Sequence, residues 1–267
     1  MSRWLLFFFG LGKGAALWCW LQAGLPVVGW AWFFAADLLV LYHLLAPAAQ
    51  GILRVATWFE TREREVWLTI DDGPDPNDTP RILVALAEHQ ARATFFLIGE
   101  KAARYPELVR GILGAGHEIG HHTHTHPAGS LWCAGPRRLA RELDAALAAY
   151  ASASGGAARV RWFRAPVGIK NLFLARALRA RRLACVHWTV RSWDSTARTA
   201  NAVVDRVMPR VRPGAIILMH EGERLHPAVR VAALRGVLEH LHGQGFRCVL
   251  PAPEQLRTSL AAWRRKR

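Results

Sequence analysis

The sequence predicts an α/β fold: a parallel sheet or barrel of about seven strands, preceded by an N-terminal hydrophobic helical hairpin. From residue 66 onward, short β-rich runs alternate with stretches of helical period, which is typical of βα repeats. Before that point, residues 4–45 are almost wholly apolar and fall into two runs. No internal repeat or long linker divides the rest of the chain. We therefore expect residues 1–50 to be anchoring helices and residues 51–267 to form one domain.

The two apolar runs, Trp4–Leu21 and Leu25–Leu45, each approach the roughly 20 residues that cross a bilayer as a helix. Lys13 and Asp37 are charges inside these runs. We predict a helical hairpin in the membrane. The sequence leaves three alternatives open: a single anchor, a signal peptide cleaved at an A-x-A-like site after the second run, and a buried helix pair of a soluble protein.

Seven segments in the rest of the chain have the composition of strands. They are Val66–Ile70, Ala93–Ile98, His117–Ile119, Val160–Phe163, Ala184–Val190, Ala215–Met219 and Phe246–Leu250. After the first strand, Thr79 as N-cap and Pro80 at the first helical position begin a helix that is expected to extend to His89. The small-residue segment Ala151–Ala158 is expected to be a surface loop before the fourth strand.

The chain is strongly basic, with a formal net charge of +15. Residues 1–50 contain only Arg3, Lys13 and Asp37 as charged residues, so the basicity belongs to the rest of the chain. Such a charge favours anionic partners such as phospholipid surfaces or phosphorylated substrates. No nucleic-acid-binding module is evident, and we predict no nucleic-acid partner. The four cysteines form no CxxC pair, which argues against a zinc ribbon and a disulfide framework.

The first chemical motif is TIDDGP at residues 69–74, where the adjacent carboxylates Asp71 and Asp72 follow the first strand. Neighbouring side chains point in different directions at a strand end. One acid can then bind a cation while the other faces the space above it, which suits a metal ligand and a general base. Considered alone, this motif also fits a solvated turn.

The second motif is GHEIGHHTHTHP at residues 116–127, a density of histidines that is rarely structural. His122 and His126 are four residues apart, so both rings can face one metal from a helical or turn-like segment, and neutral imidazole suits zinc. The segment 117–121 also matches the H-E-x-x-H protease motif. That motif works only on a continuous helix, whereas Gly116 and Gly120 bracket a strand-like pattern here.

Three further motifs follow later strands: RAPVG at residues 164–168, RSWD at 191–194 and ILMHEG at 217–222. A strand-end arginine, Arg164, can pair with an ionised carboxylate, and His220 stands at the end of the sixth strand. Together the five motifs place polar residues after strands one, three, four, five and six. This is the edge at which α/β barrels gather their active sites.

These five segments, in this order, resemble those of the polysaccharide deacetylase family, the carbohydrate esterase group with the NodB-type domain. The resemblance covers about residues 66–250 and rests on DDGP, the H-T-x-x-H of residues 122–126, RAP and LMH. It implies a distorted (β/α) barrel with about seven parallel strands. It also implies one divalent metal ion bound by an Asp and two His.

Residue by residue, the resemblance makes Asp71 the catalytic base and His220 the general acid. The metal ligands would be Asp72, His122 and His126.

The remaining roles follow from the same resemblance. Arg164 would orient the base, Leu218 would line the pocket for the acyl methyl, and the backbone N–H of Val167 would contribute to the oxyanion hole. Trp193 would belong to the substrate site, and Asp194 is the candidate partner of His220.

The chain departs from the family pattern at several positions. An aromatic residue usually stands where Val167 is, so the sugar is not determined by the sequence. The usual Asp precedes the Trp of the fourth motif, whereas Asp194 follows Trp193 here, so His220 has either this partner or none. Glu221 and His121 stand where Asp and Asn are frequent.

The implied activity is metal-dependent hydrolysis of the N-acetyl, or another N-acyl, group of an amino sugar in a glycan or lipid-linked saccharide. Zinc is the expected metal, although Co²⁺, Ni²⁺ and Mn²⁺ also suit two His and one Asp. Three other functions remain open: a zincin-type membrane metalloprotease, a phosphoesterase and a non-catalytic metal-binding protein of the membrane.

The charges beside the hairpin predict its orientation. Arg3 precedes the first run and Arg54, Arg62 and Arg64 follow the second, whereas the connecting loop has no positive charge. The positive-inside rule therefore predicts a domain that faces the cytoplasm from a bacterial-type inner membrane, with the basic domain and its terminus Trp263–Arg267 against anionic headgroups. The expected partners are the lipid bilayer and an N-acetylated amino sugar, for example one linked to polyprenyl phosphate. The alternative is an outward-facing domain that acts on peptidoglycan or an exported polysaccharide.

Overall fold

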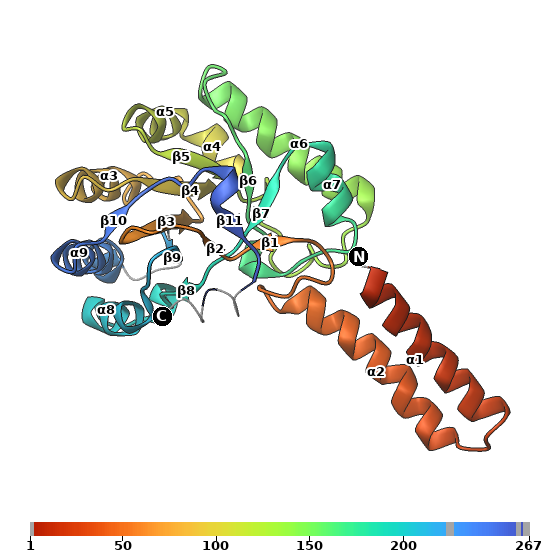
Figure 1. Cartoon of the computed structure of the whole chain (residues 1–267). Helices are drawn as coiled ribbons and strands as arrows, with labels where there is room; N and C mark the ends of the chain where they lie inside the picture. The colour runs from red at the N-terminus through yellow and green to blue at the C-terminus, as the bar shows by residue number, and fades with distance from the viewer. Residues whose placement is uncertain (1–2, 223–226, 260–262, 264–267) are drawn as a thin grey trace.

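The computed structural model describes residues 3–222, 227–259 and 263, and it shows a two-helix hairpin that projects from an α/β domain (Figure 1). The hairpin consists of α1 (Arg3–Leu21) and α2 (Pro26–Leu45). Both the predicted α/β class and the predicted hairpin are confirmed. Of the basic C-terminal segment, residues 264–267 lie outside the described residues.

The domain is organised on one sheet that curves into a nearly closed barrel. Its strand order is β1-β7-β6-β5-β4-β3-β9-β2-β11, with β10 beside β3 and β8 beside β9. The strands are β1 (Val55–Ala56), β2 (Trp58–Phe59), β3 (Glu65–Asp71), β4 (Ala93–Leu97), β5 (Glu118–His121), β6 (Trp162–Phe163), β7 (Ala184–Val186), β8 (Val190–Arg191), β9 (Ala215–His220), β10 (Arg247–Cys248) and β11 (Leu256–Arg257). In the part of this order that runs β1-β7-β6-β5-β4-β3-β9, all neighbouring strands are parallel. Strand β2 runs antiparallel to both β9 and β11.

Helices surround this sheet (Figure 1). They are α3 (Thr79–Glu88), α4 (Gly99–Arg104), α5 (Pro106–Gly114), α6 (Pro136–Ala153), α7 (Leu174–Ala180), α8 (Ala200–Val207) and α9 (Pro227–Gly243), with short 3₁₀ helices η1 (Pro166–Gly168), η2 (Asp194–Thr196), η3 (Met208–Arg210) and η4 (Pro253–Gln255). Each long central strand is followed by helix, which is the connection that parallel strands require.

The seven predicted strands are all present, with corrected ends. The fifth predicted strand is two strands, because β7 pairs with β6 and β1 whereas β8 pairs with β9. The two-residue strands β1, β2 and β11 were not predicted, since a pair of residues shows no periodicity.

Two predicted helix ends need correction. The N-cap of α3 is Asp78 rather than Thr79, because Thr79 lies inside the first turn, where its hydroxyl donates to Glu221. Residues 151–153 belong to the last turn of α6, so the surface loop begins only after them. The first difference is within the one or two residues by which helix ends vary, whereas the second is three residues long.

The central strands are buried on both faces, which explains their continuous apolar runs. Inside the barrel, Trp67 and Trp162 meet edge to face at 5.5 Å between ring centroids, and the Trp67 indole N–H donates to Thr94 Oγ1 at 2.9 Å. The opposite faces of β3 and β9 pack against the surrounding helices through residues such as Leu68 and Ile217. The resulting core holds the strand ends in fixed register.

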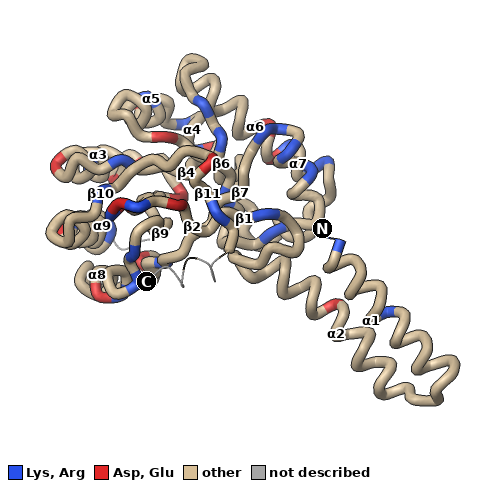
Figure 2. The backbone as a smooth tube through the Cα atoms, viewed as in Figure 1, with Lys and Arg blue, Asp and Glu red and all other residues tan. Residues whose placement is uncertain are grey.

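The hairpin is almost free of charge, as Figure 2 shows. Its two interior charges neutralise each other, because Lys13 Nζ lies 2.8 Å from Asp37 Oδ2. The helices approach closely where Gly12 meets Ala36, so that a Cβ on the glycine would lie 2.9 Å from the Ala36 Cβ. The outward-facing apolar side chains of the hairpin remain exposed; Trp4, for example, keeps 73% of its surface accessible.

The domain end of the hairpin is fixed by packing and by hydrogen bonds. Lys170, which is fully buried, donates its ammonium to the carbonyls of Ala46 and Pro47, and its backbone N–H donates to Leu44 O at 2.9 Å. These bonds cap the carbonyl end of α2. The hairpin is therefore joined directly to the loop that follows η1.

Candidate active site

The carboxyl ends of neighbouring parallel strands bring the predicted site together. Asp71 ends β3 and stands in register with His220, which ends β9. On the other side, Leu97 of β4 is in register with His121 of β5, and His121 with Phe163 of β6. The five motifs therefore meet at one edge of the barrel, as expected from their positions after the strands.

Asp72, His122 and His126 form a compact group of three. Their ligand-type atoms all lie within 4.8 Å of one another. Asp72 Oδ1 is a buried oxygen that lies 3.4 Å from His122 Nε2 and 3.2 Å from His126 Nε2. An Asp and two His with converging acceptor atoms fit a divalent cation such as zinc.

The histidine segment is a loop rather than a helix. Residues 118–121 belong to β5, and positive φ angles of 65° at Thr123 and 54° at His126 turn the chain so that the two rings meet at 4.9 Å. The zincin geometry is therefore excluded. His122 Nδ1 lies 2.8 Å from Arg164 O, so this nitrogen donates to the carbonyl, and Nε2 is the ring nitrogen that faces Asp72.

Glu142 on α6 supports this loop, and the sequence analysis missed it. Its carboxylate accepts the backbone N–H groups of His124 and Thr125 at 3.0 Å each and the Thr125 hydroxyl at 2.8 Å. The signal that could have identified Glu142 is slight, because one acid among the charged residues of an amphipathic helix is ordinary.

Asp71 is held by a buried arginine. Arg164 is fully buried and donates through Nη1 to Asp71 Oδ1 at 2.7 Å and to Thr69 Oγ1 at 2.8 Å. Its remaining donors reach the carbonyls of Val186 and His187. Each nitrogen of the guanidinium therefore has a hydrogen-bond acceptor. The other carboxylate oxygen, Asp71 Oδ2, faces the site and lies 3.8 Å from His122 Nε2.

The surroundings of Asp72 differ from those of Asp71. Burial alone would raise the pKa of Asp72, but the hydrogen bond and positive charge of His122, together with His126 and His220, lower it well below its usual value. Asp72 is thus an anionic acceptor at any working pH, as a metal ligand must be.

His220 has Asp194 as its partner. Its Nδ1–H donates to Asp194 Oδ1 at 2.7 Å, and its backbone N–H donates to Oδ2 at 2.7 Å. Burial opposes the charged form of His220, but Asp194, Asp71 and Asp72 outweigh it and raise the pKa to about 9. The left-handed φ of 55° at Trp193 turns the chain so that the Asp after the Trp, rather than the residue before it, reaches the histidine.

The site opens into a cavity of about 300 Å³. It is lined by Asp71, Asp72, His122, His126, Val167, Trp188, Arg191, Ser195, Thr196, Leu218 and His220. Val167 has a φ of 51°, and no acceptor for its backbone N–H is found among residues 3–222, 227–259 and 263. The structure thus brings together the predicted groups except one.

Trp193 is the exception, because it does not line this cavity. It is 44% exposed and stacks under the guanidinium of Arg191 at 3.8 Å. Its neighbours Ser195 and Thr196 line the cavity instead, as does Trp188, which follows β7. Sequence reasoning missed these lining residues, since their positions depend on how the loops after β7 and β8 turn.

Comparison with protein families finds a match between residues 59–184 and the polysaccharide deacetylase model. Among curated proteins, a chitooligosaccharide deacetylase of Sinorhizobium fredii is 39% identical over 203 residues, covering 73% of this chain and 93% of the relative. A peptidoglycan-N-acetylglucosamine deacetylase of Bacillus cereus is 33% identical over 199 residues, covering 73% of this chain and 69% of that relative.

Solved structures share the fold. A peptidoglycan N-acetylglucosamine deacetylase in complex with a hydroxamate-type benzamide superimposes with a TM-score of 0.68 at 30% identity, covering 77% of this chain and 94% of that one. A CE4 family pseudoenzyme of Bacillus anthracis matches with a TM-score of 0.64 at 26% identity, covering 72% of this chain and 65% of that one. This fold therefore also occurs in a protein described as a pseudoenzyme, so activity must be argued from the site.

Proposed function

Because this chain belongs to the polysaccharide deacetylase family, we propose that it removes N-acetyl groups from the amino sugars of a glycan, in the cavity between Asp72 and His220. The observation that carries the proposal is the arrangement of three kinds of group around one cavity. A cation-binding trio, a carboxylate fixed by Arg164 and a protonated histidine all face the same space.

A divalent cation on Asp72, His122 and His126 would polarise the acyl oxygen and lower the pKa of a water molecule. Zinc suits this donor set, and Co²⁺, Ni²⁺ or Mn²⁺ could replace it.

Asp71 is assigned the role of general base. Its Oδ2 faces the cavity while Arg164 holds Oδ1, so the carboxylate is oriented to accept a proton from the attacking water.

His220 is assigned the role of general acid. An amide nitrogen leaves poorly unless it is protonated, and Asp194 keeps the His220 imidazole both oriented and charged. His220 can therefore deliver a proton to the departing amine.

Two further groups fit the acyl part of the substrate. Val167 lines the cavity, and we assign its backbone N–H as a donor to the oxyanion of the tetrahedral intermediate. Leu218 supplies an apolar surface for the acetyl methyl. Acetate and a free amino sugar result.

The substrate class follows from the relatives, which are named for chitooligosaccharide and peptidoglycan N-acetylglucosamine. We propose N-acetylglucosamine or a similar N-acetylated hexosamine as the residue that is cleaved. A polyprenyl-phosphate-linked saccharide is the specific form that fits a membrane-attached enzyme.

We propose that α1 and α2 anchor the domain in a membrane. Both helices are long and apolar enough to span it, and most of their large side chains face outward unprotected, which in water would leave an extended apolar patch. The Lys13–Asp37 pair makes the two interior charges compatible with a bilayer. The arginines on both flanks favour a cytoplasmic domain.

The activity is tested with purified full-length protein and oligomers of N-acetylglucosamine. We expect release of acetate that a chelator abolishes and added zinc restores. Absence of acetate release by the zinc-loaded protein, from both oligomeric and lipid-linked substrates, would contradict the proposal and favour a pseudoenzyme.

A further inference from the structure

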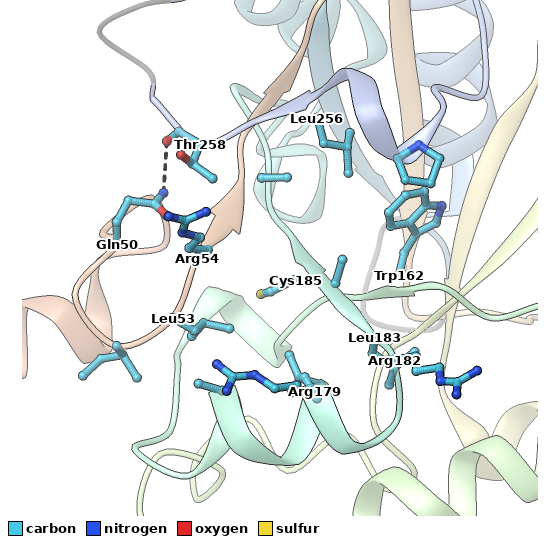
Figure 3. A pocket seen from close by; sticks show the side chains of 16 residues that line it. Gln50, Leu53, Arg54, Trp162, Arg179, Arg182, Leu183, Cys185, Leu256 and Thr258 are labelled. Carbon is cyan, nitrogen blue, oxygen red and sulfur yellow. Dashed lines mark hydrogen bonds between the residues drawn. The ribbon is translucent and has the colours of Figure 1, made fainter. Parts of the chain in front are cut away.

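A second cavity, of about 930 Å³, lies at the other edge of the barrel. Figure 3 shows the side chains that line it. Its wall includes Trp162, Ala184 and Cys185 at the amino ends of β6 and β7. None of the residues that line the candidate active site lines this cavity. Its volume is in the range of sites that hold a small organic molecule.

The floor of this cavity is apolar and continuous with the base of the hairpin. Leu53, Leu178 and Leu183 line it, and they belong to the same buried cluster as Leu5 of α1 and Leu44 of α2. The two hairpin residues lie at the ends of α1 and α2 that adjoin the domain. The cavity therefore lies at the level where a membrane-embedded hairpin meets the headgroups.

The rim of the cavity is positively charged. Arg54, Arg179 and Arg182 line it with exposed side chains (Figure 3). Within the described part of the chain, no carboxylate forms an ion pair with any of the three. A guanidinium donates two parallel hydrogen bonds to phosphate, so this rim is complementary to a phosphate group.

One wall of the cavity is formed in advance by hydrogen bonds. The Gln50 amide donates to Thr258 O at 3.1 Å (Figure 3). It also donates to Val55 O at 3.0 Å, and its Oε1 accepts the Val55 N–H at 2.8 Å. These bonds tie the segment after α2 to the segment after β11. A ligand here would find a fixed wall, which lowers the entropy cost of binding.

We propose that this cavity binds one anionic membrane phospholipid, with its charged headgroup among the rim arginines Arg54, Arg179 and Arg182 and the beginning of an acyl chain against Leu53, Leu178 and Leu183. The inference rests on the proposed membrane attachment. The bound lipid fixes how the domain stands on the bilayer, and it takes no part in the hydrolysis at the opposite edge of the sheet.

The first test measures phosphatidylglycerol retained by the full-length protein after extraction from vesicles of phosphatidylcholine and phosphatidylglycerol, by native mass spectrometry. The double variant Arg179→Ala/Arg182→Ala should bind the lipid about tenfold more weakly or worse, since each nearby cation contributes on the order of a fivefold effect. The matched control is Arg176→Ala, on an exposed position of α7 that does not line the cavity, and it should retain the lipid. Equal retention by the double variant and wild type would overturn the proposal.

The second test separates a lipid from a free phosphate. Ala184→Phe keeps the three arginines but fills the cavity from an exposed strand position, so it should also lose the lipid. Normal retention by this variant, or displacement of the lipid by glycerol phosphate at equal concentration, would show that only the charged rim matters and would overturn the proposal.

Two controls distinguish this inference from the proposals on which it rests. Flotation of wild-type protein with vesicles measures membrane attachment, and deacetylation of a soluble N-acetylglucosamine oligomer measures activity. If wild type does not float, both the attachment and this inference fail. If it floats and is active while the Arg179→Ala/Arg182→Ala protein retains lipid normally, only this inference fails.

Discussion

Adjacent carboxylates in one turn have different surroundings, and this difference predicts separable roles. Asp71 contacts buried Arg164, whereas Asp72 faces two histidines. Asp71→Asn should retain the metal and lose hydrolysis by about 10²- to 10⁴-fold, the usual effect of removing a general base. Asp72→Asn should weaken metal binding itself. Metal content and turnover are measured on the same preparations, and reversed occupancies would require the two roles to be exchanged.

The histidines divide in the same way. His117 and His121 have structural partners, because His117 Nδ1 accepts the Ala93 N–H at 3.3 Å and His121 Nε2 lies 3.0 Å from Leu143 O. Burial lowers the pKa of both to about 4, so they are neutral in the folded protein.

Replacement of His122 or His126 by Ala should therefore abolish metal binding and activity together. The matched controls, His117→Ala and His121→Ala, should lose thermal stability but keep the metal. Isothermal titration with zinc measures the outcome. Full zinc occupancy in His122→Ala would refute the assigned ligand set.

The Asp194–His220 pair predicts a pH dependence. A general acid must be protonated, so the rate should fall as the pH rises through the pKa of His220, which Asp194 helps to raise to about 9. In Asp194→Asn the pKa of His220 should fall, because burial lowers this pKa and the carboxylate that raises it is gone. The alkaline limb of the kcat profile should then move to lower pH, with His220→Ala losing the limb and most of the rate. An unchanged profile in Asp194→Asn would eliminate Asp194 as the residue that tunes the acid.

At the scale of elements, the turn between β3 and α3 encloses a buried acid. Glu221 follows β9 and is almost fully buried beside Thr79, whose hydroxyl donates to its Oε2 at 2.5 Å. Burial raises the pKa of Glu221 to about 8, and Asp78 and Asp75 act in the same direction. The carboxyl group is thus protonated in the folded protein at neutral pH.

This raised pKa predicts a loss of stability in alkali. The stabilising contribution of Glu221 is complete below its unfolded pKa, near 4.5, and is lost as the pH rises through about 8. Glu221→Gln, which keeps the neutral form, should therefore show a smaller drop in Tm than wild type between pH 5 and 9. Parallel Tm curves for the two proteins would contradict this assignment.

The same turn shows why local sequence is not enough to explain a motif. A Cβ at Gly73 would lie 1.7 Å from Glu221 Oε1, so the glycine of DDGP leaves the space that is occupied by a side chain 148 positions later in the chain. Gly73→Ala should shift both Asp72 and Glu221. The motif was recognisable in the sequence, but this reason for its glycine was not.

For the whole molecule, the hairpin predicts the side of the membrane on which the domain works. The antiparallel helices place Arg3 and the end of α2 at the same end of the hairpin (Figure 1). A green fluorescent protein fused after Arg267 should therefore fluoresce, and alkaline phosphatase fused there should be inactive. An active phosphatase with a silent fluorescent protein would place the domain outside, where peptidoglycan or an exported polysaccharide becomes the substrate.

The sequence determined this protein's fold class, its hairpin and the identity of its polar motifs, because these depend on local periodicity and on residue type. The comparisons confirm the family. Parallel β3 and β9 then require that Asp71 and His220 meet, whatever the loops do.

Only the tertiary structure decided which side chains complete the site. The φ of 55° at Trp193 turns Asp194 toward His220 and leaves the tryptophan outside the cavity. Glu142 contacts the histidine loop from α6, a helix that follows this loop in the chain. Loop conformation and contacts between distant segments depend on the packing of the whole barrel, and neither leaves a periodic signal in the sequence.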